Sequence, residues 1–277
     1  MPLRCFFCII LFFFQINLFA QKRKAWKLVW QDEFNYTGLP DSTKWGYETG
    51  HIRNNEQQYY TRARTENVYV SNGMLAITGR KENYQNKFYK EGSNDWRTKN
   101  PNADYTSASI NTLGKAAWKY GRIEVKVKLP MGGGIWPAIW MMGANRTEVG
   151  WPKCGEIDIM EFVGNKPLDI YATVHFPDSI KRSRSKGGKA TDSTLNNQFH
   201  LYAMEWNSEK IEFWFDDKKY FTFTIDSAGA TVQNPFRKPF YLLLNLAMGA
   251  NWPGQIDDAV LPQQFLIDYV RIYKQKK

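Results

Sequence analysis

Cysteine is scarce in this sequence, and its placement leaves no pair to be joined. Cys5 and Cys8 lie within the first 20 residues, so Cys154 is alone in the rest of the chain. An intramolecular disulfide is therefore excluded for residues 21–277, and stability must come from the hydrophobic core. We interpret Cys154 as a packing residue, because no histidine lies beside it in the sequence to activate its thiol.

Long helical periodicity and internal repeats are also absent, and after residue 20 no stretch is apolar enough to span a membrane. The short Phe/Ile/Leu-rich run near the start follows Arg4 and ends at Ala20. This pattern is typical of a secretory signal peptide. We therefore expect residues 1–20 to be removed, and residues 21–277 to be secreted to the cell exterior or the periplasm.

The formal net charge of +10 admits a nucleic acid, a membrane surface or an acidic polysaccharide as a partner. However, the basic residues are scattered, and their one dense cluster lies in a Gly/Ser-rich stretch, Lys181-Arg-Ser-Arg-Ser-Lys186. A solvated loop is the favoured interpretation, so we expect neither a nucleic-acid nor a membrane partner. The aromatic content of 16% is more informative, because aromatic residues supply both β-sandwich cores and surfaces on which sugars stack.

Short alternating segments separated by Gly, Pro, Asn and Asp predict an all-β fold. The clearest runs from Arg122 to Leu129, where every second residue is apolar and the others are charged. Many short strands of this kind indicate one domain over residues 21–277, a sandwich or a jelly roll. Two polar, turn-rich stretches, residues 81–105 and 178–193, are predicted to be loops at the rim of a cleft.

The candidate catalytic residues lie in one acidic run, Gly155-Glu-Ile-Asp-Ile-Met-Glu-Phe-Val-Gly164. On a regular strand Glu156 and Asp158 share one face, whereas Glu161 falls on the other. A β-bulge at Ile159-Met160 would return Glu161 to the first face. Three carboxylates in one row repel one another unless one of them holds a proton.

Glycoside hydrolysis needs such a row, because it uses one charged and one protonated carboxyl group, about 5–5.5 Å apart in retaining enzymes. Our hypothesis makes Glu156 the nucleophile and Glu161 the general acid/base, with Asp158 hydrogen-bonding to its neighbours and tuning them. A calcium site or a solvated acidic patch are the alternatives that these three residues alone leave open.

The surrounding sequence resembles glycoside hydrolase family 16, in the bulged form typical of laminarinases (endo-β-1,3-glucanases). Residues Trp151–Gly164 resemble the family's signature, and six further segments match in family order: Trp30–Phe34, Asn54–Tyr60, Tyr120–Glu124, Gly134–Trp140, Phe199–Tyr202 and Asp268–Tyr273. The resemblance implies a β-jelly-roll sandwich of two antiparallel sheets with a concave substrate cleft. It also implies a retaining mechanism and the three carboxylate roles given above.

Several aromatic residues are candidates for sugar binding. Trp136 and Trp140 share a strand face with Ala138 between them, which suits the apolar face of a glucose ring, although one of the two could belong to the core. The resemblance places their strand beside the catalytic one and favours binding. Trp151, just before the acidic run, and Trp252, in a late loop, are further candidate platforms.

Two polar residues complete the predicted cleft, and one position departs from the family. The resemblance implies that Asn55 holds sugar hydroxyls and that His175 faces the cleft to hydrogen-bond sugar or Glu161. A lone histidine is otherwise more often structural. Many family members carry Arg where this chain has Ser109, so we expect one subsite to be weaker or differently shaped.

The resemblance further implies a structural Ca²⁺ near Glu33, Gly73 and Asp268, and no cofactor for catalysis. The function predicted is a secreted, monomeric, retaining endo-β-1,3-glucanase with β-glucan as substrate. Alternatives are a mixed-linkage β-1,3-1,4-glucanase, a hydrolase of agar- or carrageenan-type galactans, and a non-catalytic β-glucan-binding protein. The last is disfavoured because all three carboxylates are present.

Overall fold

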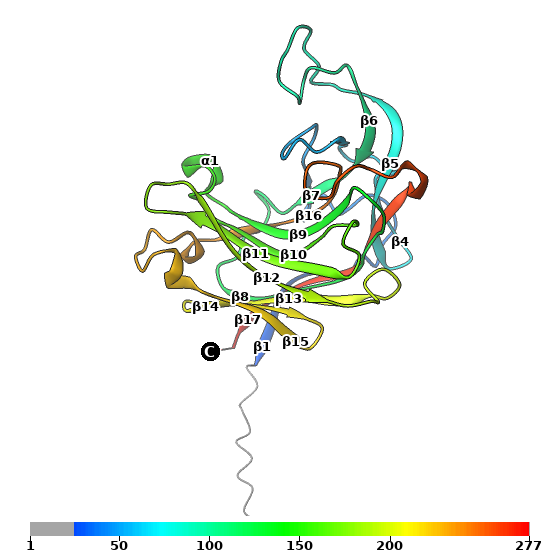
Figure 1. The fold of residues 1–277 in the computed structure, drawn as a ribbon. Coiled ribbons are helices and arrows are strands. Elements are labelled where there is room, and N and C mark those ends of the chain that lie inside the picture. Colours follow the sequence, from blue (N-terminus) through cyan, green and yellow to red (C-terminus); the bar gives the residue numbers. More distant parts are fainter. Residues whose placement is uncertain (1–24, 277) are drawn as a thin grey trace, which may run out of the picture.

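Two stacked β-sheets form the fold in the computed structural model, which describes residues 25–276 (Figure 1). The predicted signal peptide, residues 1–20, lies outside the described residues. Within residues 25–276, no helix is both long enough and apolar enough to cross a membrane. The expected all-β jelly-roll sandwich is confirmed.

The larger sheet has ten strands among the described residues, in the order β15-β14-β13-β8-β17-β5-β6-β3, with β1 paired to β17 and β4 paired to β5. The strands are β1 (Trp26–Asp32), β3 (Gln58–Tyr60), β4 (Val68–Ser71), β5 (Met74–Gln85), β6 (Asn102–Ser107), β8 (Gly121–Lys128), β13 (His200–Trp206), β14 (Lys210–Phe215), β15 (Lys218–Thr224) and β17 (Gln263–Gln275). Only β3 and β6 pair in parallel within this described sheet.

The smaller sheet has seven strands in the described part of the chain, in the order β12-β11-β10-β9-β16-β7-β2. They are β2 (Gly46–Tyr47), β7 (Ser109–Asn111), β9 (Ile135–Gly143), β10 (Glu156–Phe162), β11 (Asp169–Pro177), β12 (Ser183–Thr191) and β16 (Phe240–Met248). One short helix, α1 (Arg146–Val149), and 3₁₀ turns at Ile225–Ala228, Pro235–Arg237 and Asp258–Val260 lie in the connections.

The hydrophobic core fills the space between the two sheets. Ile123, Val125 and Val127 of β8 are fully buried, as their alternation predicts, and β16 is buried along its whole length. Cys154 is buried and packs against Met142, with 3.4 Å between the two sulfur atoms. The interpretation of this cysteine as a packing residue is therefore confirmed.

The two stretches predicted as loops contain more strand than expected. Residues 183–191 form β12, which pairs antiparallel with β11 over its full length. Because β12 is an edge strand with mostly exposed side chains, it has no apolar alternation to reveal it. Likewise β5 continues to Gln85 and β6 begins at Asn102, so residues 86–101 cap a long hairpin that extends beyond the sandwich (Figure 1).

Candidate active site

The predicted bulge lies where the acidic run needs it. Between β10 and β9, Asp158 pairs with Trp140 and Glu161 pairs with Ala138, so three residue steps on β10 face two on β9. The extra residue lets both Ile159 and Met160 pack into the core. As a result, Glu156, Asp158 and Glu161 all lie on the sheet face that is turned away from the core.

The neighbouring strands place their own side chains on the same face. On β11, His175 pairs with Glu156 and Thr173 pairs with Asp158; on β16, Asn245 pairs with Ala138 of β9. Above them lies a cleft of about 500 Å³. Its lining contains the predicted Trp136, Trp140, Trp151, Glu156, Glu161, His175 and Trp252.

Each outer carboxylate accepts a hydrogen bond from a tryptophan. The indole Nε1 of Trp151 donates to Glu156 Oε2 at 2.6 Å, and that of Trp136 donates to Glu161 Oε1 at 3.2 Å. These donors orient the two groups whose geometry decides whether a glycosidic bond can be attacked on one side and protonated on the other.

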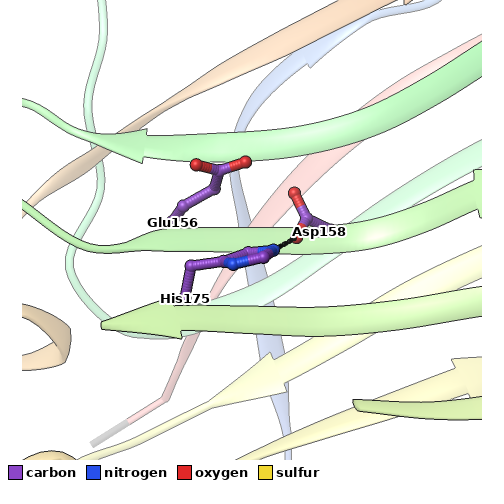
Figure 2. A group of neighbouring side chains, drawn as sticks. All are labelled: Glu156, Asp158 and His175. Carbon is purple, nitrogen blue, oxygen red and sulfur yellow. Dashed lines mark ion pairs between the residues drawn. The ribbon is translucent and has the colours of Figure 1, made fainter. Parts of the chain in front are cut away.

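Asp158 lies between the outer two carboxylates and is 3% exposed. Its Oδ2 atom is 3.2 Å from Nε2 of His175, and Figure 2 shows the imidazole ring directed at this carboxyl group beside Glu156. Ligand atoms of Glu156, Asp158 and His175 lie within 4.8 Å of one another, so within residues 25–276 these three side chains form a group that could hold a metal ion.

The environment favours the protonated form of two carboxyl groups. Burial and the charge of Glu156 raise the pKa of Asp158 well above its ordinary value. Burial and the charges of Asp158 and Glu156 likewise raise the pKa of Glu161, whereas His175 and the Trp136 N–H oppose this rise. A proton on Glu161 is what a general acid requires at neutral pH.

Three of the predicted platforms form two aromatic groups in the cleft. Trp136 meets Trp252 edge to face, with ring centroids 5.2 Å apart, and Trp252 meets Tyr171 in the same manner at 5.3 Å. Trp151 is 47% exposed and lies tilted against His175, with centroids 6.2 Å apart. Glu161 thus has one aromatic wall beside it and Glu156 has the other.

Trp140 is placed differently from an open platform. It is 5% exposed, its Nε1 donates to Asn245 Oδ1 at 2.7 Å, and the guanidinium carbon of Arg53 lies 4.8 Å from the ring centroid. The ring therefore belongs to the floor of the cleft, with Arg53 on top of it.

Several polar cleft residues were not predicted from the sequence, among them Arg53, Asn54, Arg146 and Asn245. The sequence offered one indication of these residues, namely that Arg53 and Asn54 directly precede the predicted sugar-binding residue Asn55. Asn55 itself lines a neighbouring groove and not the pocket that contains the three carboxylates, whereas Asn54 lines that pocket. The sugar-binding role of Asn55 stays a prediction.

Ser109 explains how Arg53 is held. Its Oγ donates to Glu48 Oε2 at 2.6 Å, and the same carboxylate forms an ion pair with Arg53. The pKa of Glu48 is lowered by Arg53 and Ser109 despite burial, which raises it. Ser109 of β7 and Arg53 from the loop before β3 thus share the Glu48 carboxylate.

The carboxylates of two residues predicted to bind calcium are paired with cations, and the calcium site stays a prediction. Both oxygens of Glu33 accept hydrogen bonds from Arg271 at 2.7 Å, and Asp268 forms an ion pair with Lys126 at 2.8 Å. Gly73 occupies the tight turn between β4 and β5. Calcium would have to displace both cations to gain carboxylate ligands.

Comparison with known proteins agrees with this geometry. A β-glucanase from Rhodothermus marinus is 41% identical over 266 residues, which is 92% of this chain and 87% of that protein. The structure of a laminarinase from the same organism superposes with a TM-score of 0.78 at 40% identity, covering 92% of this chain and 99% of that one.

A further structure comes from work on endo-acting O-glycanases that human gut bacteria express to initiate mucin breakdown. It superposes with a TM-score of 0.84 at 40% identity and covers 91% of both chains. The sequence model of the glycosyl hydrolases family 16 matches residues 55–271. The chain therefore belongs to glycosyl hydrolase family 16 and is a glycoside hydrolase.

Proposed function

We propose that the protein is a retaining endo-β-1,3-glucanase that acts by double displacement. The observation that carries this proposal is the bulged row on β10, which aligns Glu156, Asp158 and Glu161 on one face and raises the pKa of Glu161. A charged nucleophile and a protonated acid on one strand are the two groups that this mechanism needs.

In the first step, a carboxylate oxygen of Glu156 attacks the anomeric carbon and the bond to the leaving oxygen breaks. Glu161 gives its proton to that oxygen, so the departing sugar leaves as a neutral alcohol. The product is an ester between Glu156 and the sugar, and Glu161 is now a carboxylate. Trp151 keeps the attacking group oriented through its hydrogen bond.

In the second step, Glu161 takes a proton from water while the water oxygen attacks the anomeric carbon. The ester bond to Glu156 breaks, and both carboxyl groups return to their starting states. Asp158 and His175 do not exchange atoms with the substrate. Their contact at 3.2 Å fixes the middle of the row beside Glu156.

A β-1,3-glucan is the favoured substrate for two reasons. The signature segment and Asn54–Tyr60 resemble laminarinase sequences, and an R. marinus laminarinase is among the similar structures. Trp136, Trp252 and Trp151 offer aromatic surface to the apolar faces of glucose rings. A mixed-linkage β-1,3-1,4-glucan has the same sugar and is the nearest alternative.

A second candidate substrate is an O-glycan chain of mucin or another galactose-containing chain. The TM-score of 0.84 with the O-glycanase structure supports it. A second argument is Ser109, at a position where the family resemblance leads us to expect arginine. In this chain Arg53 covers Trp140 instead, so the floor of one subsite differs.

Product analysis tests these substrates against each other. Purified residues 21–277 are incubated with laminarin, mixed-linkage glucan, agarose, κ-carrageenan and mucin, and the products are separated by chromatography. Short oligosaccharides from laminarin, released faster than from the other polymers, are the expected result. Cleavage of a galactan or mucin alone would overturn the glucan assignment and leave the three carboxylate roles intact.

Glu156→Gln is the control for the mechanism. It removes the nucleophile while keeping the size of the side chain, so hydrolysis should be lost and the thermal unfolding temperature largely kept. Retained hydrolysis would refute the role of Glu156. Laminarin binding without hydrolysis by the unmodified protein would instead favour a glucan-binding protein.

Secretion and the monomeric state are part of the same proposal. They rest on the apolar segment that ends at Ala20 and on the domain size. N-terminal sequencing of the protein recovered outside the cytoplasm, together with light scattering, tests both: a start near Gln21 and the mass of one chain are expected.

A further inference from the structure

A second groove, distinct from the catalytic cleft, lies against the hairpin that joins β5 and β6. Its volume of about 380 Å³ is in the range of small-molecule sites, about 300–1,000 Å³. Figure 1 shows the hairpin extending beyond the two sheets. The hairpin and the loop before β3 supply its main side chains: Trp96, Lys99 and Asn100 from the former, and His51, Asn55 and Gln57 from the latter.

The hairpin is held in a fixed shape. Asn86 is 3% exposed, and its amide donates to the carbonyl oxygens of Arg97 at 2.9 Å and Asn100 at 3.0 Å. The Trp96 ring lies 5.9 Å from the ring of His51, which meets the buried Tyr59 edge to face at 5.7 Å. The groove is therefore preformed, which reduces the entropy lost when a ligand binds.

The side chains of the groove suit a neutral, polyhydroxylated ligand. Trp96 is only partly buried and offers a ring face, while the amides of Asn55, Asn100 and Gln57 donate and accept hydrogen bonds. Lys99, Asp104 and the buried Glu56 line the groove, so it contains no basic cluster. An anionic ligand would call for a basic cluster instead.

One loop separates this groove from the catalytic cleft. Asn54 lines the cleft, Asn55 lines the groove, and Glu56 contacts both. The two asparagines have backbone φ angles of 56° and 53°, in the left-handed region that asparagine tolerates. The cleft and the groove are therefore neighbours on either side of this loop.

We propose that this groove is a second glycan-binding site, which holds an uncleaved, neutral stretch of the polysaccharide that the cleft hydrolyses. The inference rests on the proposed function in requiring a polymeric glycan as substrate. Once a polysaccharide chain is bound at one of the two sites, its effective concentration at the other site rises. The groove therefore lowers KM for polymers and leaves short oligosaccharides unaffected.

Trp96→Ala tests this site, with kinetics measured on the polymer that the unmodified enzyme cleaves fastest and on the shortest oligosaccharide that it cleaves. KM for the polymer should rise about three- to tenfold, as expected for the loss of one aromatic contact. The kcat for the polymer and kcat/KM for the oligosaccharide should stay unchanged. Tyr89→Ala is the matched control, because Tyr89 is a 42% exposed aromatic residue of the same hairpin that does not line the groove.

Asn100→Ala is a second variant in case Trp96→Ala does not fold. It removes an amide from the groove and keeps the backbone carbonyl that Asn86 holds. An unchanged polymer KM in the folded variants, or an equal rise for polymer and oligosaccharide, would overturn the proposal.

The test does not depend on which polymer is cleaved. If laminarin is not hydrolysed, the glucan assignment fails, and the groove is tested on the polymer that is. If none is hydrolysed, electrophoresis through gels containing each polymer replaces kinetics. Retardation of the unmodified protein that Trp96→Ala abolishes would then support the groove, and equal mobility would refute it.

Discussion

The guanidinium of Arg53 covers the ring of Trp140, with 4.8 Å between the guanidinium carbon and the ring centroid. An ion pair with Glu48 holds the arginine in place, and Ser109 donates a hydrogen bond to the Glu48 carboxylate. Trp140 is consequently closed to direct stacking by a sugar in this conformation. A sugar in this part of the cleft would contact the planar guanidinium, which donates hydrogen bonds. An uncovered indole ring would instead offer an apolar face.

Arg53→Lys is expected to impair substrate binding with little effect on stability. Lysine keeps a positive charge near Glu48 but loses the planar group over Trp140. We expect KM to rise about three- to tenfold and the unfolding temperature to change by less than about 2 °C. Arg182→Lys, at an exposed arginine paired with Asp178, is the control for a generic effect of this exchange. An unchanged KM would show that the guanidinium does not contact substrate.

Arg53→Ala, in contrast, should destabilise the fold. The Glu48 side chain is 14% exposed, so removing its cation leaves a largely buried carboxylate without a counter-charge. The expected cost is about 3–5 kcal/mol, and the double variant with Glu48→Gln should recover part of it. Chemical denaturation of both variants provides the measurement. Equal stability of the single and double variants would mean that the ion pair does not anchor this loop.

Neutralising Asp158 or Glu161 should stabilise the protein at alkaline pH. Because the pKa of each group is raised in the folded state, the folded protein binds more protons than the unfolded chain between the two pKa values. The resulting stability is complete below the unfolded pKa, about 4, and is lost as the pH rises through the folded pKa.

Asp158→Asn and Glu161→Gln should therefore each raise Tm by about 2–4 °C at pH 8 and leave it nearly unchanged at pH 4. Thermal unfolding at the two pH values checks the sign. An equal Tm difference at pH 4 and at pH 8 would mean that the pKa values of these groups are not raised in the folded state.

Trp136→Phe should shift the alkaline limb of the kcat profile to higher pH. The Trp136 N–H donates to Glu161 and lowers the pKa of that carboxyl group, so its removal raises the pKa further. Phenylalanine keeps an aromatic ring beside Trp252. The pH dependence of kcat reports groups in the enzyme–substrate complex, which separates this effect from weaker binding. A limb that moves to lower pH would be inconsistent with the hydrogen bond.

The sequence reveals the catalytic row because its chemistry is local. Glu156, Asp158 and Glu161 lie within six consecutive residues, and strand parity together with a single bulge leads to the observed arrangement. The long buried strands are equally visible, because burial imposes an apolar pattern on β8 and β16.

Other features depend on contacts between distant segments. The position of Trp140 is decided by Arg53, 87 positions earlier in the chain, and by Asn245, 105 positions later. The alternation of side chains along β9 correctly places Trp140 on the cleft face, but it does not reveal that Arg53 covers the ring. Edge strand β12 was missed for a related reason, since its pairing with β11 needs no apolar side chains.

The anomeric configuration of the first product tests the central claim most directly, namely that Glu156 and Glu161 act by double displacement. Proton NMR spectra are recorded in the first minutes of hydrolysis, before the product mutarotates. With laminarin, or with whichever β-linked polymer the enzyme cleaves fastest, the mechanism predicts that the β-anomer forms first and the α-anomer grows in later. An α-anomer that appears first would mean inversion, and would contradict the role of Glu156 as a covalent nucleophile.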